Sequence, residues 1–321
     1  MGAGAFAAPV LSAVHGSSSI DLIGTATQPD RIAGRKRILT PTPLGLWADA
    51  HGIPCQRVSS VNSEEYLNQL RALAPDLIVV VSFGQILKQP LLDLPRLGCL
   101  NVHASILPKY RGASPIASSI LNGDTETGIT FMQMERGLDS GPIYKIIRAP
   151  ITNDVTTETL EQTLAGMAGR EIESVLLGIA NASMQPVPQP VEGVSVVTKI
   201  HKNDGSIDWN EDAFLIERKI RAYAKWPNTR FCLNHGNKLL TVKITKASAT
   251  SYSTSRDCGT VLSLPEKRHI MVQCGNGALL IDRVLPEGKK EMAVSDFLNG
   301  VKISVGTLFL NGPDKLPPQD T

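Results

Sequence analysis

Apolar runs and segments of helical period alternate along residues 1–183. Residues 76–82 (DLIVVVS) form a continuous apolar run, which is typical of a strand buried on both faces. Asn62 or Ser63 caps a helix that we expect to end near Leu73. This alternation predicts an α/β domain with a doubly wound, Rossmann-like and mostly parallel sheet. Its other expected strands are 20–27, 55–58, 100–104 and 128–134, and its other expected helices are 43–52, 114–122 and 156–181.

A proline-rich segment follows this domain. Residues 185–192 (QPVPQPVE) contain three prolines, which favour neither helix nor strand, so we expect residues 184–198 to be a linker. The remaining residues, 199–321, are expected to form a small OB-like β-barrel domain. That prediction is based on one helix at 211–224 and five short strand-like runs at 229–234, 239–246, 259–264, 269–274 and 278–284.

The charge is divided unevenly between the two parts. Residues 1–198 carry 14 Lys and Arg against 17 Asp and Glu, whereas residues 199–321 carry 18 against 13. The basic excess in the second part favours contact with a polyanion, and solvated lysines are the alternative.

The cysteines and the apolar segments indicate the cellular compartment. The five cysteines are scattered and form no CxxC pair, which is typical of reduced thiols in a cytosol-like compartment and argues against a disulfide framework. Residues 1–16 lack a basic region of the kind that opens a signal peptide, and no apolar run reaches the ~18 residues of a membrane span. We expect a cytoplasmic protein without a membrane partner.

The first residues match a dinucleotide-binding pattern only weakly. Gly2, Gly4 and Ala7 fit G-x-G-x-x-G/A, but the pattern requires a preceding strand, and none precedes it here. Asp21 also begins the expected second strand, although an acidic ribose ligand would end it. Nicotinamide binding is therefore disfavoured.

The segment 98–115 (GCLNVHASILPKYRGASP) carries the strongest candidate chemistry. Asn101 and His103 are two residues apart in a strand, so their side chains share one face. They lie where the strand ends, at the edge where open α/β sheets bind ligands. A structural histidine beside a loop-capping asparagine is the alternative.

A second candidate segment, 128–144, presents Asp139 in a glycine-rich loop. If that loop returns to Asn101 and His103, the three side chains suit acyl transfer to an amine, with a donor for an oxyanion, a base and a carboxylate that orients it. The sequence indicates neither a covalent nucleophile nor a metal site.

A third candidate segment, 28–43, is basic. It carries Arg31, Arg35, Lys36 and Arg37 and could contact phosphates, with a solvated loop as the alternative.

Three segments of the chain, 81–87 (VSFGQIL), 98–116 and 123–141, resemble the 10-formyltetrahydrofolate-dependent formyltransferases. Residues 27–35 (TQPDRIAGR) are similar to a loop that a tRNA-acting member of this family inserts beside the acceptor stem, and 207–210, 217–227 and 285–290 resemble its tRNA-binding domain. The resemblance covers nearly the whole chain.

The resemblance implies a function and a set of site residues. The expected reaction moves a formyl group from 10-formyltetrahydrofolate to the α-amine of methionyl-initiator tRNA, by a monomer that needs no metal. Asn101, His103 and Asp139 correspond to the catalytic residues, and Arg35, with Lys36 and Arg37, would contact tRNA. The folate-binding S-L-L-P of the family corresponds to Ser105, Ile106, Leu107 and Pro108.

One departure concerns the start of the chain. Members of the family open with a strand similar to RIVFxGTPxFA, whereas this chain reads MGAGAFA, so we expect an upstream apolar strand to be missing from the sequence. Three alternatives stay open at this point. They are a related formyltransferase that acts on a glycinamide ribonucleotide or an amino sugar, an RNA-binding protein with an impaired catalytic domain, and an organellar instead of a bacterial source.

Overall fold

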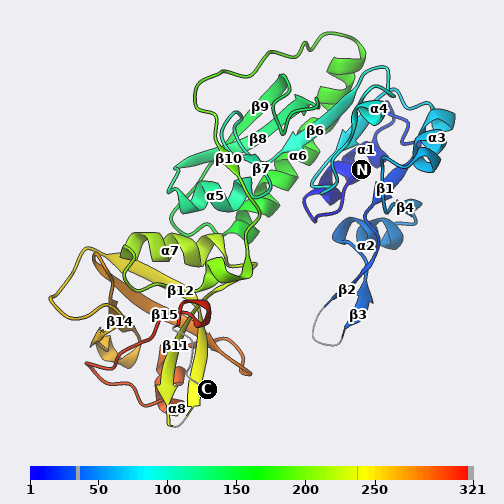
Figure 1. The fold of residues 1–321 in the computed structure, drawn as a ribbon. Coiled ribbons are helices and arrows are strands. Elements are labelled where there is room, and N and C mark those ends of the chain that lie inside the picture. The colour runs from blue at the N-terminus through cyan, green and yellow to red at the C-terminus, as the bar shows by residue number, and fades with distance from the viewer. Residues whose placement is uncertain (34–36, 237, 317–321) are drawn as a thin grey trace. The chain divides into compact units, whose positions relative to one another are not determined.

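The computed structural model describes residues 1–33, 37–236 and 238–316, and the chain divides into two compact units (Figure 1). Unit 1 consists of Met1–Pro115, Glu126–Pro150 and Leu160–Val197. Unit 2 consists of Ile116–Thr125, Ile151–Thr159 and Thr198–Thr321. Two short segments from the first part of the sequence therefore belong to unit 2.

A four-stranded sheet in the order β5-β6-β8-β9 forms the centre of unit 1. Its strands are β5 (Ile78–Val80), β6 (Cys99–His103), β8 (Glu126–Gln133) and β9 (Ile143–Pro150). Only β5 and β6 run parallel, whereas β8 is antiparallel to both β6 and β9. The expectation of a mostly parallel sheet is corrected to a mixed sheet. Its β8–β9 pair is antiparallel because the short loop between these two strands can only join antiparallel neighbours.

A second, parallel pair consists of β1 (Thr25–Thr27) and β4 (Cys55–Arg57). The first residues of the chain lie between this pair and the sheet. The Gly2 N–H donates to the Ala26 carbonyl at 3.0 Å, and the Val81 N–H donates to the Met1 carbonyl at 2.9 Å. An apolar cavity of about 570 Å³ adjoins Met1. The expectation of a missing upstream strand stays a prediction.

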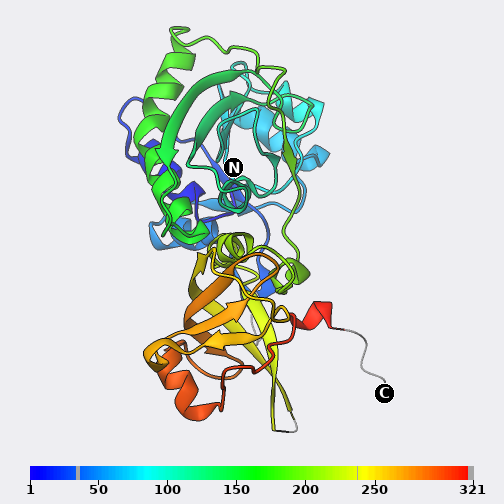
Figure 2. The same ribbon diagram turned by 90° about the vertical axis from the view of Figure 1, so that its left-hand side faces the viewer.

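Two helices of unit 1 begin directly after a residue whose side chain caps them. Thr42 accepts a hydrogen bond from the Gly45 N–H at the start of α2 (Pro43–Ala50), and Ser63 accepts one from the Tyr66 N–H at the start of α3 (Glu64–Leu73). The long helix α6 (Thr157–Ala180) runs beside the sheet in both views (Figures 1 and 2). Lys145 of β9 pairs with Glu171 of α6. The remaining elements are α1 (Ala7–Gly16), α4 (Gln89–Leu92), the antiparallel pair β2 (Arg31–Ala33) and β3 (Ile38–Thr40), and the parallel pair β7 (Arg111–Gly112) and β10 (Val196–Val197).

Unit 2 is built on an antiparallel sheet in the order β11-β12-β15-β14-β13, with β16 on β15. The rings of Trp209, Phe231 and Phe309 meet in its core, where Phe231 stacks on Phe309 with centroids 4.5 Å apart. None of the described helices is long and apolar enough to cross a membrane. The elements of unit 2 are β11 (Thr229–His235), β12 (Lys238–Thr250), β13 (Val261–Ser263), β14 (Ile270–Gln273), β15 (Ala278–Pro286), β16 (Met292–Ala293), α7 (Ala213–Ala222), α8 (Val294–Gly300), most of α5 (Pro115–Leu121), and the short η1 (Lys202–Gly205), η2 (Pro265–Lys267) and η3 (Pro313–Lys315).

Candidate active site

Strand β6 presents Asn101 and His103 on one face at its carboxyl end. Between them Val102 points to the opposite face and is buried. The strand is held on both sides, since Asn101 aligns with Val80 of β5 and His103 aligns with Thr130 of β8. Both polar side chains are therefore carried by a rigid element.

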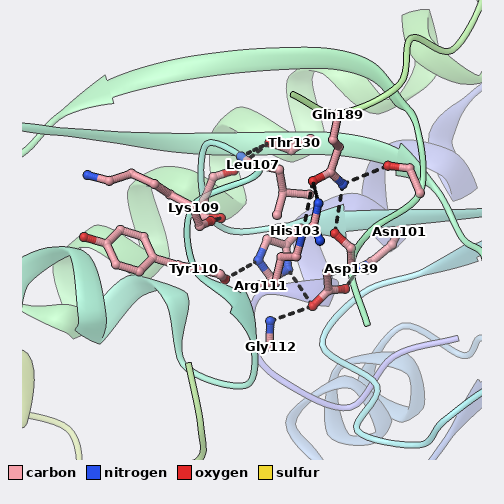
Figure 3. Close-up of polar contacts among 12 residues, drawn as sticks. Asn101, His103, Leu107, Lys109, Tyr110, Arg111, Gly112, Thr130, Asp139 and Gln189 are labelled. Atoms are coloured by element: carbon pink, nitrogen blue, oxygen red, sulfur yellow. Dashed lines mark hydrogen bonds and ion pairs between the residues drawn. The ribbon is translucent and has the colours of Figure 1, made fainter. Parts of the chain in front are cut away.

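The loop between β8 and β9 brings Asp139 to the same place (Figure 3). The Asn101 Nδ2 donates to Asp139 Oδ1 at 3.0 Å, and the Gly112 N–H donates to Asp139 Oδ2 at 2.8 Å. His103 Nδ1 lies 3.7 Å from Asp139 Oδ2. Asn101, His103 and Asp139, which the sequence placed in two separate segments, are thus brought together.

The orientation of the His103 ring is set by a backbone carbonyl. His103 Nε2 lies 2.8 Å from the Tyr110 carbonyl oxygen, which can only accept a hydrogen bond. Nε2 therefore carries the hydrogen, and Nδ1 is the ring nitrogen that faces Asp139. Because 3.7 Å is too long for a hydrogen bond, Asp139 acts on the ring through its charge.

Residues 105–108 form a tight turn after β6. Ser105 is fully buried, and its hydroxyl donates to the Lys109 carbonyl at 2.6 Å. The Thr130 hydroxyl donates to the Ser105 carbonyl at 2.7 Å and accepts from the Leu107 N–H at 3.1 Å. Leu107 is buried, while Ile106 and Pro108 are partly exposed. The hydroxyls of Ser105 and of Thr130 in β8 therefore hold the shape of the turn.

The sequence reasoning missed two residues of the site, Arg111 and Gln189. The Gln189 side chain bonds the backbone of the Asp139 loop and the Arg111 guanidinium. Gln189 lies within the segment that was expected to be a linker. Its only sequence signal was a polar residue between Pro188 and Pro190.

The basic loop is described only in part. Arg35 and Lys36, two of the residues expected to contact tRNA, lie outside the described residues. Arg37 is exposed and precedes β3. Arg31 of β2 donates to Gln28 at 2.8 Å.

The thiol nearest the candidate residues along the chain is that of Cys99. Burial raises the pKa of the Cys99 thiol at the start of β6 to about 12, so this thiol is protonated and a poor nucleophile. No group of three His, Cys, Asp or Glu side chains that could hold a metal occurs among the described residues.

Comparisons with known proteins agree over most of the chain. A family model described as formyl transferase matches residues 1–176, and one described as formyl transferase, C-terminal domain, matches residues 199–302. The methionyl-tRNA formyltransferase of Xylella fastidiosa is 43% identical over 296 residues, which cover 92% of this chain and 94% of that protein. The methionyl-tRNA formyltransferase of Myxococcus xanthus is 39% identical over 288 residues, which cover 89% and 90%.

A solved structure is similar in fold. The N-formyltransferase from Helicobacter canadensis, in complex with folinic acid and dTDP-3-aminofucose, has a TM-score of 0.61 at 19% identity. The match covers 91% of this chain and 97% of that one. At this identity the likeness concerns the fold alone.

Proposed function

The chain belongs to the formyltransferase family, and we propose that Asn101, His103 and Asp139 are the residues with which it formylates methionyl-tRNA. The substrate follows from relatives that are about 40% identical over nine-tenths of both chains. The proposed catalytic roles are based on one observation, that all three side chains meet at the end of β6.

The reaction is a direct transfer without a covalent enzyme intermediate. The methionyl α-amine attacks the formyl carbon, the bond from that carbon to N10 of the folate breaks, and the amine proton moves to the leaving nitrogen. The Asn101 carboxamide nitrogen carries two hydrogens, and Asp139 accepts one of them. The second can stabilise the oxyanion that forms on the formyl oxygen.

His103 relays the proton at Nδ1, because Nε2 donates to the Tyr110 carbonyl. When Nδ1 takes up the amine proton, the ring becomes cationic 3.7 Å from Asp139 Oδ2. The carboxylate stabilises that charge, and its own position is fixed by the Gly112 N–H.

The formyl donor in this proposal is 10-formyltetrahydrofolate, held by the turn of Ser105, Ile106, Leu107 and Pro108. Ile106 and Pro108 have partly exposed side chains and can contact the folate, whereas Ser105 and Leu107 hold the turn from inside. A resemblance to the S-L-L-P motif and the position of the turn directly after His103 support this assignment.

The tRNA is held by the basic residues 199–321 and by the loop containing Arg35, Lys36 and Arg37. We assign an OB-like barrel to unit 2, closed by residues 307–310. In support, Leu310 bonds Cys232 of β11 in both directions, and the Val261 N–H at the start of β13 donates to the Thr307 carbonyl at 2.8 Å. Selection of initiator tRNA, action as a monomer in the bacterial cytoplasm and the predicted domain ranges belong to the same proposal.

The test is formylation with three acceptors and 10-formyltetrahydrofolate as donor. Methionyl-initiator tRNA should be formylated, whereas a glycinamide ribonucleotide and an amino-sugar nucleotide should not. Uncharged tRNA is the control, because it lacks the attacking amine. Formylation of a small amine at a rate equal to that of the charged tRNA would contradict the proposal.

A further inference from the structure

A single glutamine, Gln189, bonds both the backbone of the Asp139 loop and the side chain of Arg111. Gln189 Nε2 donates to the Asp139 carbonyl and to the Gly141 carbonyl, both at 2.8 Å. Gln189 Oε1 accepts from Arg111 Nε at 3.1 Å and from Arg111 Nη2 at 2.7 Å. Both hydrogens and both lone pairs of the carboxamide are therefore used (Figure 3).

The loop that carries Asp139 requires such support. Asp139 has a φ of +46°, in the left-handed region that non-glycine residues rarely adopt. The two hydrogen bonds from Gln189 fix the peptide that follows Asp139 and the one that follows Gly141. Because a carboxylate is carried by its own backbone, these bonds also set the place from which Oδ1 and Oδ2 reach Asn101 and Gly112.

The segment around Gln189 is itself fixed at both ends, so it can act as a rigid support. On one side Val187 and Ile143 exchange backbone hydrogen bonds of 2.8 and 2.7 Å. On the other side the Arg111 N–H donates to the Ser195 carbonyl at 2.9 Å, and the Ala113 N–H donates to the Val197 carbonyl at 3.0 Å. The same segment thus holds both the Asp139 loop and the residues that flank Gly112.

We infer that Gln189 is a positioning residue for formyl transfer, acting through Asp139. This inference rests on the role proposed above for Asp139. Gln189 itself contacts neither substrate nor reacting atoms in this scheme. It keeps the carboxylate beside His103, and its loss should lower the rate of transfer and leave substrate binding unchanged.

The experiment compares Gln189→Met with the matched control Gln185→Met. Gln185 lies in the same proline-rich segment, is exposed and donates to the nearby Ala182 carbonyl at 3.0 Å. We expect Gln189→Met to lower kcat about 10–100-fold, the range that misplacement of a reacting group produces. The KM values for folate and tRNA should stay within about twofold of wild type, and Gln185→Met should be fully active.

A double variant shows whether the effect passes through Asp139. If it does, Gln189→Met combined with Asp139→Asn should be no slower than Asp139→Asn alone. Gln189→Glu provides a second readout, because it retains the bond from Arg111 but has no hydrogen to donate at neutral pH. Its activity relative to wild type should rise as the pH falls and the new carboxyl becomes protonated.

The outcomes separate this inference from the proposed function. Full kcat in Gln189→Met, with a slow Asp139→Asn, overturns the positioning role and leaves the proposed mechanism intact. Full activity of Asp139→Asn overturns the role of Asp139 itself. Multiplicative losses in the double variant would mean that Gln189 does not act through Asp139, which also overturns the inference. If Gln189→Met loses folded structure by circular dichroism, Gln189→Glu supplies the measurement.

Discussion

At the scale of single residues, the proposed mechanism depends on which nitrogen of His103 would exchange a proton. The Tyr110 carbonyl occupies Nε2, so the ring cannot rotate or change tautomer without losing a buried hydrogen bond. The Tyr110 carbonyl, and not Asp139, therefore orients the ring. In the proposed mechanism, Asp139 balances the charge at Nδ1, from which its Oδ2 lies 3.7 Å away.

His103→Ala should lower kcat on methionyl-tRNA by ~10²–10⁴, the usual contribution of a general acid–base residue. The folate Kd should change little, because the turn of residues 105–108 is held by Thr130 and not by His103. Steady-state kinetics with charged tRNA and a folate-binding titration measure the two quantities. His15→Ala, at an exposed position of α1, is the control. A His103→Ala enzyme with more than half of the wild-type kcat would remove His103 from the mechanism.

At the scale of elements, the turn of residues 105–108 and strand β8 are joined by one hydroxyl. Thr130 Oγ1 serves two buried backbone groups of the turn, the Ser105 carbonyl and the Leu107 N–H. A strand of the central sheet thereby sets the shape of the segment that we propose holds the folate. The same strand offers a close comparison, since Thr127 is equally buried and its hydroxyl has no hydrogen-bond partner among the described residues.

Thr130→Val should weaken folate binding and lower the free energy of unfolding by about 1–3 kcal/mol for each backbone group left unpaired. Thr127→Val, an identical change three residues away, should leave the folate Kd unchanged and the stability unchanged or higher. Isothermal titration with folate measures the Kd, and unfolding in urea measures the free energy of unfolding. Equal behaviour of the two variants would show that the hydroxyl of Thr130 does not control the turn.

The elements also explain how far the sequence could predict this structure. Helix α3 was predicted almost to the residue, because Ser63 is a strong cap and apolar positions recur with helical period. Strand β9 was missed, since its residues are mostly half-buried and show no alternation of apolar and polar positions. Helix α1 was missed because the glycines that precede it, Gly2 and Gly4, fit the pattern of a phosphate-binding loop.

The site was predictable only as far as single segments carry a pattern. The pairing of Asn101 with His103 follows from the two-residue period of a strand. The contacts of Gln189 and the hydrogen bond from His103 to the Tyr110 carbonyl depend on backbone geometry between distant or turning segments. The boundaries of 1–183, 184–198 and 199–321 stay a prediction.

At the scale of the whole molecule, the uneven charge predicts that the affinity for tRNA depends strongly on salt concentration and that the affinity for folate does not. Residues 199–321 carry five more cations than anions, and residues 1–198 carry three more anions than cations. A tRNA bound through phosphate contacts displaces its condensed counterions, so its affinity falls as salt rises. A folate held in a turn after β6 displaces few.

We therefore expect the logarithm of the tRNA association constant to fall linearly with the logarithm of the salt concentration, by about 0.7–0.9 for each phosphate contact. Arg37→Ala should reduce that slope by about one contact, because Arg37 is exposed in the basic loop. Lys88→Ala removes an exposed cation of unit 1 outside that loop and should leave the slope unchanged. Filter binding of methionyl-tRNA between low and physiological salt measures the slope, and folate titration under the same conditions is the reference.

If the slope of Arg37→Ala equals that of wild type, Arg37 does not contact a phosphate and this part of the loop is a solvated surface. A tRNA slope no steeper than that of folate would mean that the basic excess of residues 199–321 does not bind the phosphates.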